Sequence, residues 1–273
     1  MIATQQKKDF LRVFNSLCTA RQAWQVWMDW IGATACSISI AADKTDRDSW
    51  DRRVEEFKHA MKGLGDEAKA QELFDILVDA LEKDPYQDFL GDLYMELGLG
   101  SHWHGQFFTP VSLCRLMAEV TIGKSVEALN EKGWISVADP ACGAGATLIA
   151  AAGAYSQREI NYQKRILFAG QDIDRVTAQM CYIQLSLLGC AGYVIVGNTL
   201  TDPATGPVLI PDRKKEQELW YTPMLLIDEV WQFRRMVQQC DLQISKAGKK
   251  VMQPTEGRMF IFTFDEKEVC NAG

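Results

Sequence analysis

Residues 135–153, ISVADPACGAGATLIAAAG, constrain the fold of this chain more than any other segment. A β-branched run ends at the pair Asp139-Pro140, a Gly-x-Gly turn follows, and an alanine-rich helix begins. Proteins of the α/β class commonly build nucleotide-type sites from a strand, a tight turn and a helix N-terminus, because the backbone amides there face the ligand. Gly143 and Gly145 are the expected contact points, since a residue without Cβ permits close approach to the backbone.

Strands and helices alternate around this turn. We predict strands over residues 135–139, 166–171 and 193–196, and helices from about residue 144 and over 174–188. Short connections between such elements imply a parallel sheet that is covered on both faces. Residues 101–273 are therefore predicted to form a Rossmann-like α/β domain. Its part after residue 200 is poorly defined, with a loop over 201–217, a helix from Thr222 and one last strand in MFIFTFD.

The first hundred residues are predicted to form an all-helical N-terminal domain, residues 1–100. Apolar residues recur there at helical spacing, in helices that open near Asp48, Asp66 and Asp84-Pro85. Further upstream, Trp24, Trp27 and Trp30 belong to an aromatic stripe that is typical of core packing or of a helix–helix interface.

Composition narrows the classes of function. The net charge of −7 argues against tight, independent DNA binding. Basic residues near the end of the sequence, such as Arg213–Lys215, alternate with acidic residues, as on a solvated surface. The eight cysteines form no Cys-x-x-Cys pair and the chain has three histidines, so we expect no metal site. Without a long apolar run or a signal pattern, the chain is expected to be cytoplasmic, with no membrane segment.

The turn differs from two common nucleotide motifs. Leu148 stands where a dinucleotide fingerprint needs its third glycine, and no Gly-Lys-Ser/Thr follows as in a phosphate-binding loop. A ligand that joins an adenosine to an amino acid fits better, with Asp139 near its ammonium group. Asp172 follows the second strand, where it can bind both ribose hydroxyls or cap the next helix; we assign the ribose to Asp172 and the cap to Asp174.

The order of the motifs then points to a family. GQFFTP (105–110), DPACGAG, GQDID and GNTL, preceded by FLGDLYMEL, resemble the gamma-type N-6 adenine DNA methyltransferases, in particular the modification subunits of type I restriction–modification systems. The resemblance covers residues 85–200. It implies the fold of S-adenosylmethionine-dependent methyltransferases and S-adenosylmethionine as the cofactor. The few strands that the sequence predicts indicate that the sheet of this fold is incomplete here.

The resemblance also assigns site residues. Phe108, Thr109, Asp139 and the turn would contact the methionine end of the cofactor, Asp172 the ribose and Ile173 the adenine. Asn198 replaces an aspartate that the family often has after the third strand. The cofactor-binding residues are thus Phe108, Thr109, Asp139, Ala141, Gly143, Gly145, Asp172, Ile173 and Asn198.

The family's catalytic motif is missing. Methylation of the adenine amine needs a flipped base and acceptors for its N–H bonds, which the family supplies with Asn/Asp/Ser-Pro-Pro-Tyr/Phe. No two of the eight prolines are adjacent. By position, the nearest candidate for this motif is Val208–Asp212, in which Asp212 could accept a hydrogen bond. DPYQ (84–87) matches the motif only superficially. No catalytic residue is assigned.

Two principal hypotheses follow. The chain is an S-adenosylmethionine-binding protein of DNA modification, active as an adenine methyltransferase, or a catalytically inactive partner or regulatory subunit. A methyltransferase for a protein or a small molecule is a third reading. We expect DNA as a partner, reached with the help of another subunit, and a protein partner or a second copy of the chain on the helical N-terminal domain.

Overall fold

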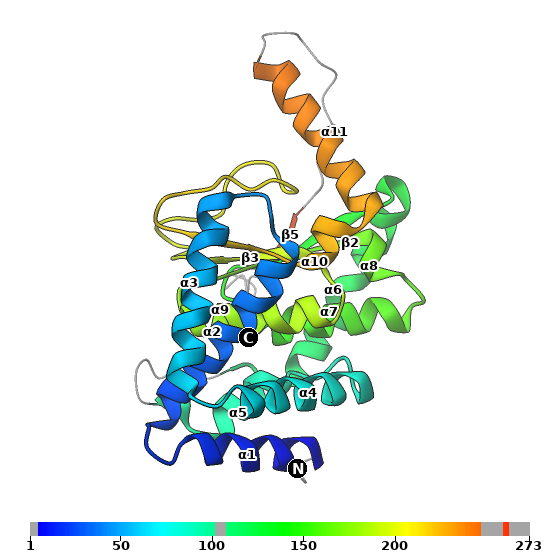
Figure 1. Ribbon diagram of the computed structural model, residues 1–273. Helices are drawn as coiled ribbons and strands as arrows, with labels where there is room; N and C mark the ends of the chain where they lie inside the picture. Colours follow the sequence, from blue (N-terminus) through cyan, green and yellow to red (C-terminus); the bar gives the residue numbers. More distant parts are fainter. Residues whose placement is uncertain (1–4, 102–107, 247–258, 262–273) are drawn as a thin grey trace.

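The computed structural model describes residues 5–101, 108–246 and 259–261. Helices surround an open sheet (Figure 1). The helices are α1 (Gln5–Leu17), α2 (Ala23–Ala42), α3 (Arg47–Leu64), α4 (Glu67–Lys83), α5 (Phe89–Glu96), the short 3-10 helix η1 (Leu99–Ser101), α6 (Val111–Lys132), α7 (Ala146–Gln157), α8 (Tyr162–Arg165), α9 (Arg175–Leu187), α10 (Pro223–Ile227) and α11 (Glu229–Lys246). The strands are β1 (Ile135–Asp139), β2 (Ile166–Asp172), β3 (Ala191–Val196), β4 (Glu218–Tyr221) and β5 (Met259–Ile261).

The sheet confirms the predicted α/β class. Its strand order is β4-β3-β2-β1-β5, and β1, β2, β3 and β5 are parallel. The register pairs Asp139 with Gly170, and Asp172 with Val196. Because parallel strands end at the same edge of a sheet, the polar residues that follow β1, β2 and β3 are brought together there.

Both faces of the sheet carry apolar side chains. On one face Val137, Phe168 and Val194 belong to a core that includes residues of α7 and α9. On the other face Ala138, Ala169 and Tyr193 belong to a smaller core with Leu209 and Trp231. The loop between β3 and β4 therefore covers the second face together with the start of α11.

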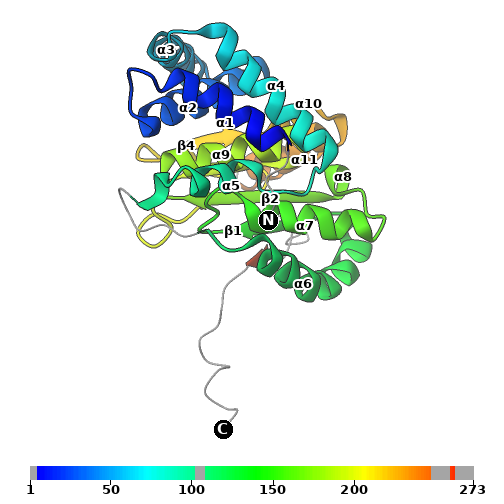
Figure 2. The same ribbon diagram turned by 90° about the horizontal axis from the view of Figure 1, so that it is seen from below.

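The N-terminal helices stack on the α7 and α9 side of the sheet (Figure 2). Phe10 makes edge-to-face contacts with Trp30 and with Phe89, at centroid distances of 5.0 Å and 5.9 Å. The core that contains these rings continues without a break into α7 and α9, and α2 contacts α9 directly. The division of the chain into domains 1–100 and 101–273 stays a prediction.

One predicted helix start is wrong. Asp84 does not open a helix; it is the C-cap of α4, and α5 begins later, with Asp88 accepting a hydrogen bond from the amide of Gly91. The Gln87 carboxamide donates to the carbonyls of Ala80 and Asp84, which closes the last turn of α4. Tyr86 lies against Gly153 of α7, so DPYQ forms a packed connection between two helices.

The region after residue 200 contains two further differences. The predicted helix from Thr222 is divided into α10 and α11, because the Asp228 carboxylate accepts from the amides of Val230 and Trp231 and starts a new helix. Strand β4 was not predicted. It pairs antiparallel with β3 at the edge of the sheet, where the Arg175 guanidinium binds Glu218 at 2.8 Å.

Candidate cofactor site

The turn after β1 has the geometry that its glycines predict. Gly143 and Gly145 have φ angles of 51° and 97°, a left-handed region that residues with a side chain rarely adopt. The amide of Gly145 donates to the carbonyl of Cys142 at 2.8 Å. A Cβ at Gly145 would lie 2.8 Å from Sγ of Cys181 on α9, so the helix packs directly against the turn.

Asp139 ends β1 and stabilises the turn from below. It is buried, and its carboxylate accepts hydrogen bonds from the amide of Ala141, at 3.0 Å, and from the hydroxyl of Thr147. Thr147 lies in the first turn of α7, so the acid joins the end of the strand to the start of the helix.

Asp172 reaches the same turn from the end of β2. One carboxylate oxygen accepts from the amide of Gly143 at 2.8 Å, and the other from the amide of Asp174 at 2.9 Å. Burial raises the pKa of Asp172, and these two backbone donors partly oppose the shift. Each oxygen keeps a further lone pair, so the partly desolvated carboxylate can accept hydroxyl donors from a ligand. Asp174 caps α9 as predicted, by accepting from the amides of Val176 and Thr177.

Phe108 covers the turn on another side. A Cβ at Gly143 would lie 3.2 Å from two atoms of the Phe108 ring, which shows that the ring rests on this glycine. Tyr94 of α5 stacks on Phe108 with the centroids 5.5 Å apart. The structure thus brings the helical segment before the α/β region to the edge of the turn.

The remaining predicted site residues form the rim. Ile173 is 66% exposed, although it is large and apolar, and Thr109 and Ala141 are also exposed. The Asn198 carboxamide oxygen accepts from the amides of Leu200 and Thr201, so this side chain holds its own turn in place. Direct contacts join Asp139 to Ala141, and Gly143 to both Asp172 and Phe108, while Gly145 belongs to the same turn.

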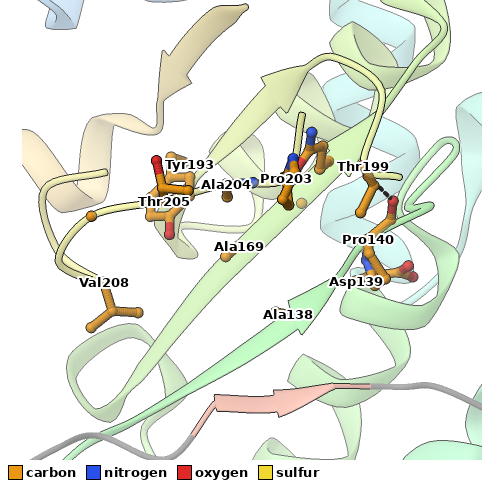
Figure 3. Close-up of a pocket in the computed structure, with 13 residues that line it drawn as sticks. Ala138, Asp139, Pro140, Ala169, Tyr193, Thr199, Pro203, Ala204, Thr205 and Val208 are labelled. Atoms are coloured by element: carbon orange, nitrogen blue, oxygen red, sulfur yellow. Dashed lines mark hydrogen bonds between the residues drawn. The ribbon is translucent and has the colours of Figure 1, made fainter. Parts of the chain in front are cut away.

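A pocket of about 180 Å³ opens beside Asp139. It lies between the second face of the sheet and the loop after β3, as Figure 3 shows, with Asp139 and Pro140 at one end and Val208 at the other. The Thr199 hydroxyl donates to the Pro140 carbonyl at 2.6 Å and joins the loop to the end of β1. The lining is mainly apolar, and Ala138, Ala169 and Tyr193 contribute to it from β1, β2 and β3.

Other residues that the sequence singled out lie elsewhere. Asp212 lines a separate polar pocket with residues of α3, and its carboxylate accepts from the Thr205 hydroxyl at 2.9 Å. Arg213 and Lys214 pair with Asp46 and Asp202, as expected of a solvated charged surface. Residues 105–107 of GQFFTP lie outside the described residues.

Three further residues support the site and were not predicted from the sequence. These are Thr147, Tyr94 and Gln184, whose carboxamide donates to the Ala144 carbonyl at 2.9 Å. A signal existed for Gln184, because a polar residue within the apolar face of α9 needs a buried partner.

Residues 5–101, 108–246 and 259–261 contain no group of three metal-ligating side chains. Within the same ranges, every helix is too short or too polar to span a lipid bilayer.

Comparison with known proteins bears on the family. Residues 86–219 match the family model of the N-6 DNA methylases. A Listeria monocytogenes protein described as a class I S-adenosylmethionine-dependent methyltransferase matches with 14% identity and a TM-score of 0.41, over 76% of this chain and 58% of that one. A type I restriction–modification methyltransferase subunit from Streptococcus thermophilus matches with 13% identity and a TM-score of 0.35, over 72% and 59%.

This chain therefore spans less than two thirds of the length of these solved chains. No curated protein matches it. The family match contains β1, β2, β3, the glycine turn and both acids that bind it, and it agrees with the resemblance carried by the motifs. Residues 86–219 thus match the N-6 DNA methylase family, the family that the motifs of this chain resemble.

Proposed function

We propose that this chain binds S-adenosylmethionine at the turn after β1 and acts in DNA modification. The observation that carries the proposal is the convergence of Asp139, Asp172 and Phe108 on one left-handed glycine turn. Three elements far apart in the sequence supply these side chains. Their chemistry suits a ligand that carries a diol, a flat base and an amino acid.

Each part of the cofactor has a proposed partner. Asp172 would accept hydrogen bonds from the ribose hydroxyls, because its carboxylate is partly desolvated and keeps free lone pairs. Ile173 would lie against the adenine, which would bury an exposed apolar side chain. Thr109, Phe108 and the turn from Asp139 to Gly145 would contact the methionine end. Asn198 would lie near the adenine edge.

The substrate proposal rests on the family. Bound S-adenosylmethionine supplies an electrophilic methyl group, and an adenine of DNA is the proposed acceptor. The printed sequence lacks Asn/Asp-Pro-Pro-Tyr/Phe, so we expect the isolated chain to bind the cofactor but to methylate DNA poorly or not at all. DNA would then be reached together with another subunit in the cytoplasm, with the N-terminal helices as the protein-binding surface.

Calorimetric titration with S-adenosylmethionine tests the pocket. Wild type should bind, and Asp172→Ala should lose at least tenfold in affinity, since a buried carboxylate that binds two hydroxyls contributes on the order of 2 kcal/mol. Asp228→Ala is the matched control, because this carboxylate also accepts from two backbone amides but lies at the start of α11. Equal binding by wild type and Asp172→Ala would contradict the assignment.

Transfer of labelled methyl to unmethylated genomic DNA tests the chemistry. We expect no label with the purified chain, in a sample whose cofactor binding has been verified. Label in adenine would show that the chain is an active methyltransferase with a divergent catalytic loop, and Asp212 would then be the first residue to replace. Label that appears only when a second subunit is added would support the partner hypothesis.

A further inference from the structure

A buried polar network lies directly beneath the glycine turn. Its centre is Gln184 of α9, which is 1% exposed. The Gln184 carboxamide nitrogen donates to Asp88, at 2.8 Å, and to the carbonyl of Ala144, at 2.9 Å. Its oxygen accepts from the amide of Leu90 at 3.1 Å. One side chain therefore joins the start of α5 to the turn after β1.

Asp88 holds Gln184 in this orientation. Its side chain is buried at the N-terminus of α5 and also accepts from the amide of Gly91, at 2.9 Å. A Cβ at Gly91 would lie 2.1 Å from an Asp88 oxygen, so this position has room for glycine only. Burial raises the pKa of Asp88 to about 6, and the hydrogen bonds from Gln184 and Gly91 oppose this shift.

Charged and titratable neighbours do not replace these contacts. Lys7 of α1 pairs with Asp92 at 2.5 Å, and Asp92 raises the pKa of Asp88 while Lys7 lowers it. Cys114 of α6 lies near enough for Asp88 to raise the pKa of its thiol. The two hydrogen bonds from Gln184 and Gly91 are therefore the direct support of the Asp88 carboxylate.

The Ala144 carbonyl, which Gln184 binds, lies in the later part of the turn. The amides of Ala141, Cys142 and Gly143 are bound by Asp139, the Gln171 carbonyl and Asp172. The carbonyl of Ala144 lies between two glycines in the left-handed region, where local sterics restrict the backbone least. A contact from outside the turn must fix its direction, and Gln184 makes that contact.

We propose that Gln184, held by Asp88, is a positioning residue of the cofactor site, and that it couples the α5 segment to the shape of the glycine turn. The inference rests on the proposed function, because it assigns a role in S-adenosylmethionine binding. It adds a determinant that does not itself touch the cofactor. Without Gln184 the backbone of the turn would sample more conformations, and affinity would fall.

Gln184→Met tests the role of the carboxamide. Methionine has a similar length and volume but no carboxamide, so it removes all three hydrogen bonds with little change in packing. We expect the dissociation constant for S-adenosylmethionine to rise about tenfold, as for the loss of about 1.4 kcal/mol. Asp88→Asn keeps an oxygen acceptor for Gln184 and Gly91, and should stay within about threefold of wild type.

Ser125→Ala is the matched control. The Ser125 hydroxyl shares a buried hydrogen bond of 2.8 Å with Tyr155, between α6 and α7, and no turn residue takes part. Its melting temperature should fall about as much as that of Gln184→Met, while its cofactor affinity should stay unchanged. Unchanged affinity in Gln184→Met, or an equal loss in Ser125→Ala, would overturn the proposal.

Hydrogen exchange separates this inference from the proposed function. In the free protein, the amides of Gly143 and Gly145 should exchange faster in Gln184→Met than in wild type, and not in Ser125→Ala. If wild type binds no S-adenosylmethionine, the proposed function fails. The exchange rates still test whether Gln184 stabilises the conformation of the turn. Equal exchange rates of these amides in all three proteins would show that Gln184 does not stabilise the turn.

Discussion

Asp88 shows how burial changes the chemistry of a single carboxyl group. Its pKa of about 6 in the folded protein exceeds the ordinary value of 3.8. The folded state therefore binds the proton more tightly than the unfolded state, and the protonated acid stabilises the fold. This contribution is complete below about pH 4 and disappears as the pH rises through about 6.

Replacing Asp88 should make this effect measurable. Between pH 4.5 and pH 8, wild type should lose about 2 kcal/mol of unfolding free energy relative to Asp88→Asn, because asparagine does not titrate. Urea unfolding of both proteins at the two pH values gives the difference. Parallel pH dependence of the two proteins would show that Asp88 titrates near its ordinary pKa.

Gly145 is the position of the turn that tolerates a side chain least. Alanine there meets an unfavourable φ of 97° and a Cβ position 2.8 Å from Sγ of Cys181. We expect Gly145→Ala to destabilise the protein by about 2 kcal/mol or more and to abolish cofactor binding. Gly133→Ala is the control, since its φ of 77° is also positive but nothing lies within 4 Å of its Cβ position. Cofactor binding by Gly145→Ala with unchanged affinity would contradict this expectation.

At the scale of elements, β4 depends on partners outside the sheet. The Arg53 guanidinium of α3 donates to the carbonyl of Leu219 at 2.7 Å, and binds Asp43 at 3.0 Å. It also lies over the Trp220 ring, 4.3 Å from the centroid. One buried cation thereby fastens an edge strand to α2 and α3.

Removing that cation should be costly. Arg53→Met leaves the Asp43 carboxylate buried without its counter-charge, and should destabilise the protein by about 3 kcal/mol. Adding Asp43→Asn to Arg53→Met should recover part of this loss, because the remaining charge is also removed. Chemical unfolding of the two single variants and the double variant measures the coupling. A double variant with the sum of both single losses would mean that the pair is not coupled.

At the scale of the whole molecule, the N-terminal helices and the sheet share one apolar core. Residues as far apart as Phe10 and Trp220 belong to the same cluster of buried side chains. A shared core of this kind favours one cooperative unfolding transition over two. Arg175 adds a polar link, because its guanidinium binds both Glu56 of α3 and Glu218 of β4.

Buried cysteines report on this cooperativity. Cys36 lies in α2, while Cys181 and Cys190 lie in the α/β region, and all three are buried. We expect their thiols to become reactive at the same urea concentration, as mass spectrometry of alkylated protein can measure. Earlier exposure of Cys36 would indicate that the helices unfold separately, in agreement with a domain boundary near residue 100.

Local patterns in the sequence were sufficient for much of the fold. A β-branched run before a glycine turn predicts β1 and α7, and a capping acid predicts the start of α9, because both signals act over a few residues. Asp139, Gly143 and Asp172 could be predicted as site residues because they lie at or just after the ends of predicted strands. Parallel strands bring their carboxyl ends to one edge of the sheet. The family resemblance then predicted S-adenosylmethionine as the cofactor.

Only the tertiary structure decided the features that depend on contacts between residues far apart in the sequence. Strand β4 is four residues long, and its place is set by pairing with β3 and by Arg53 and Arg175. Asp84 resembles a helix cap, yet Asp88 caps α5 because Gln184 binds it across 96 residues. Hydrogen bonds of this kind form only after the chain has collapsed, so no local pattern encodes them. They place the start of α5 under the glycine turn.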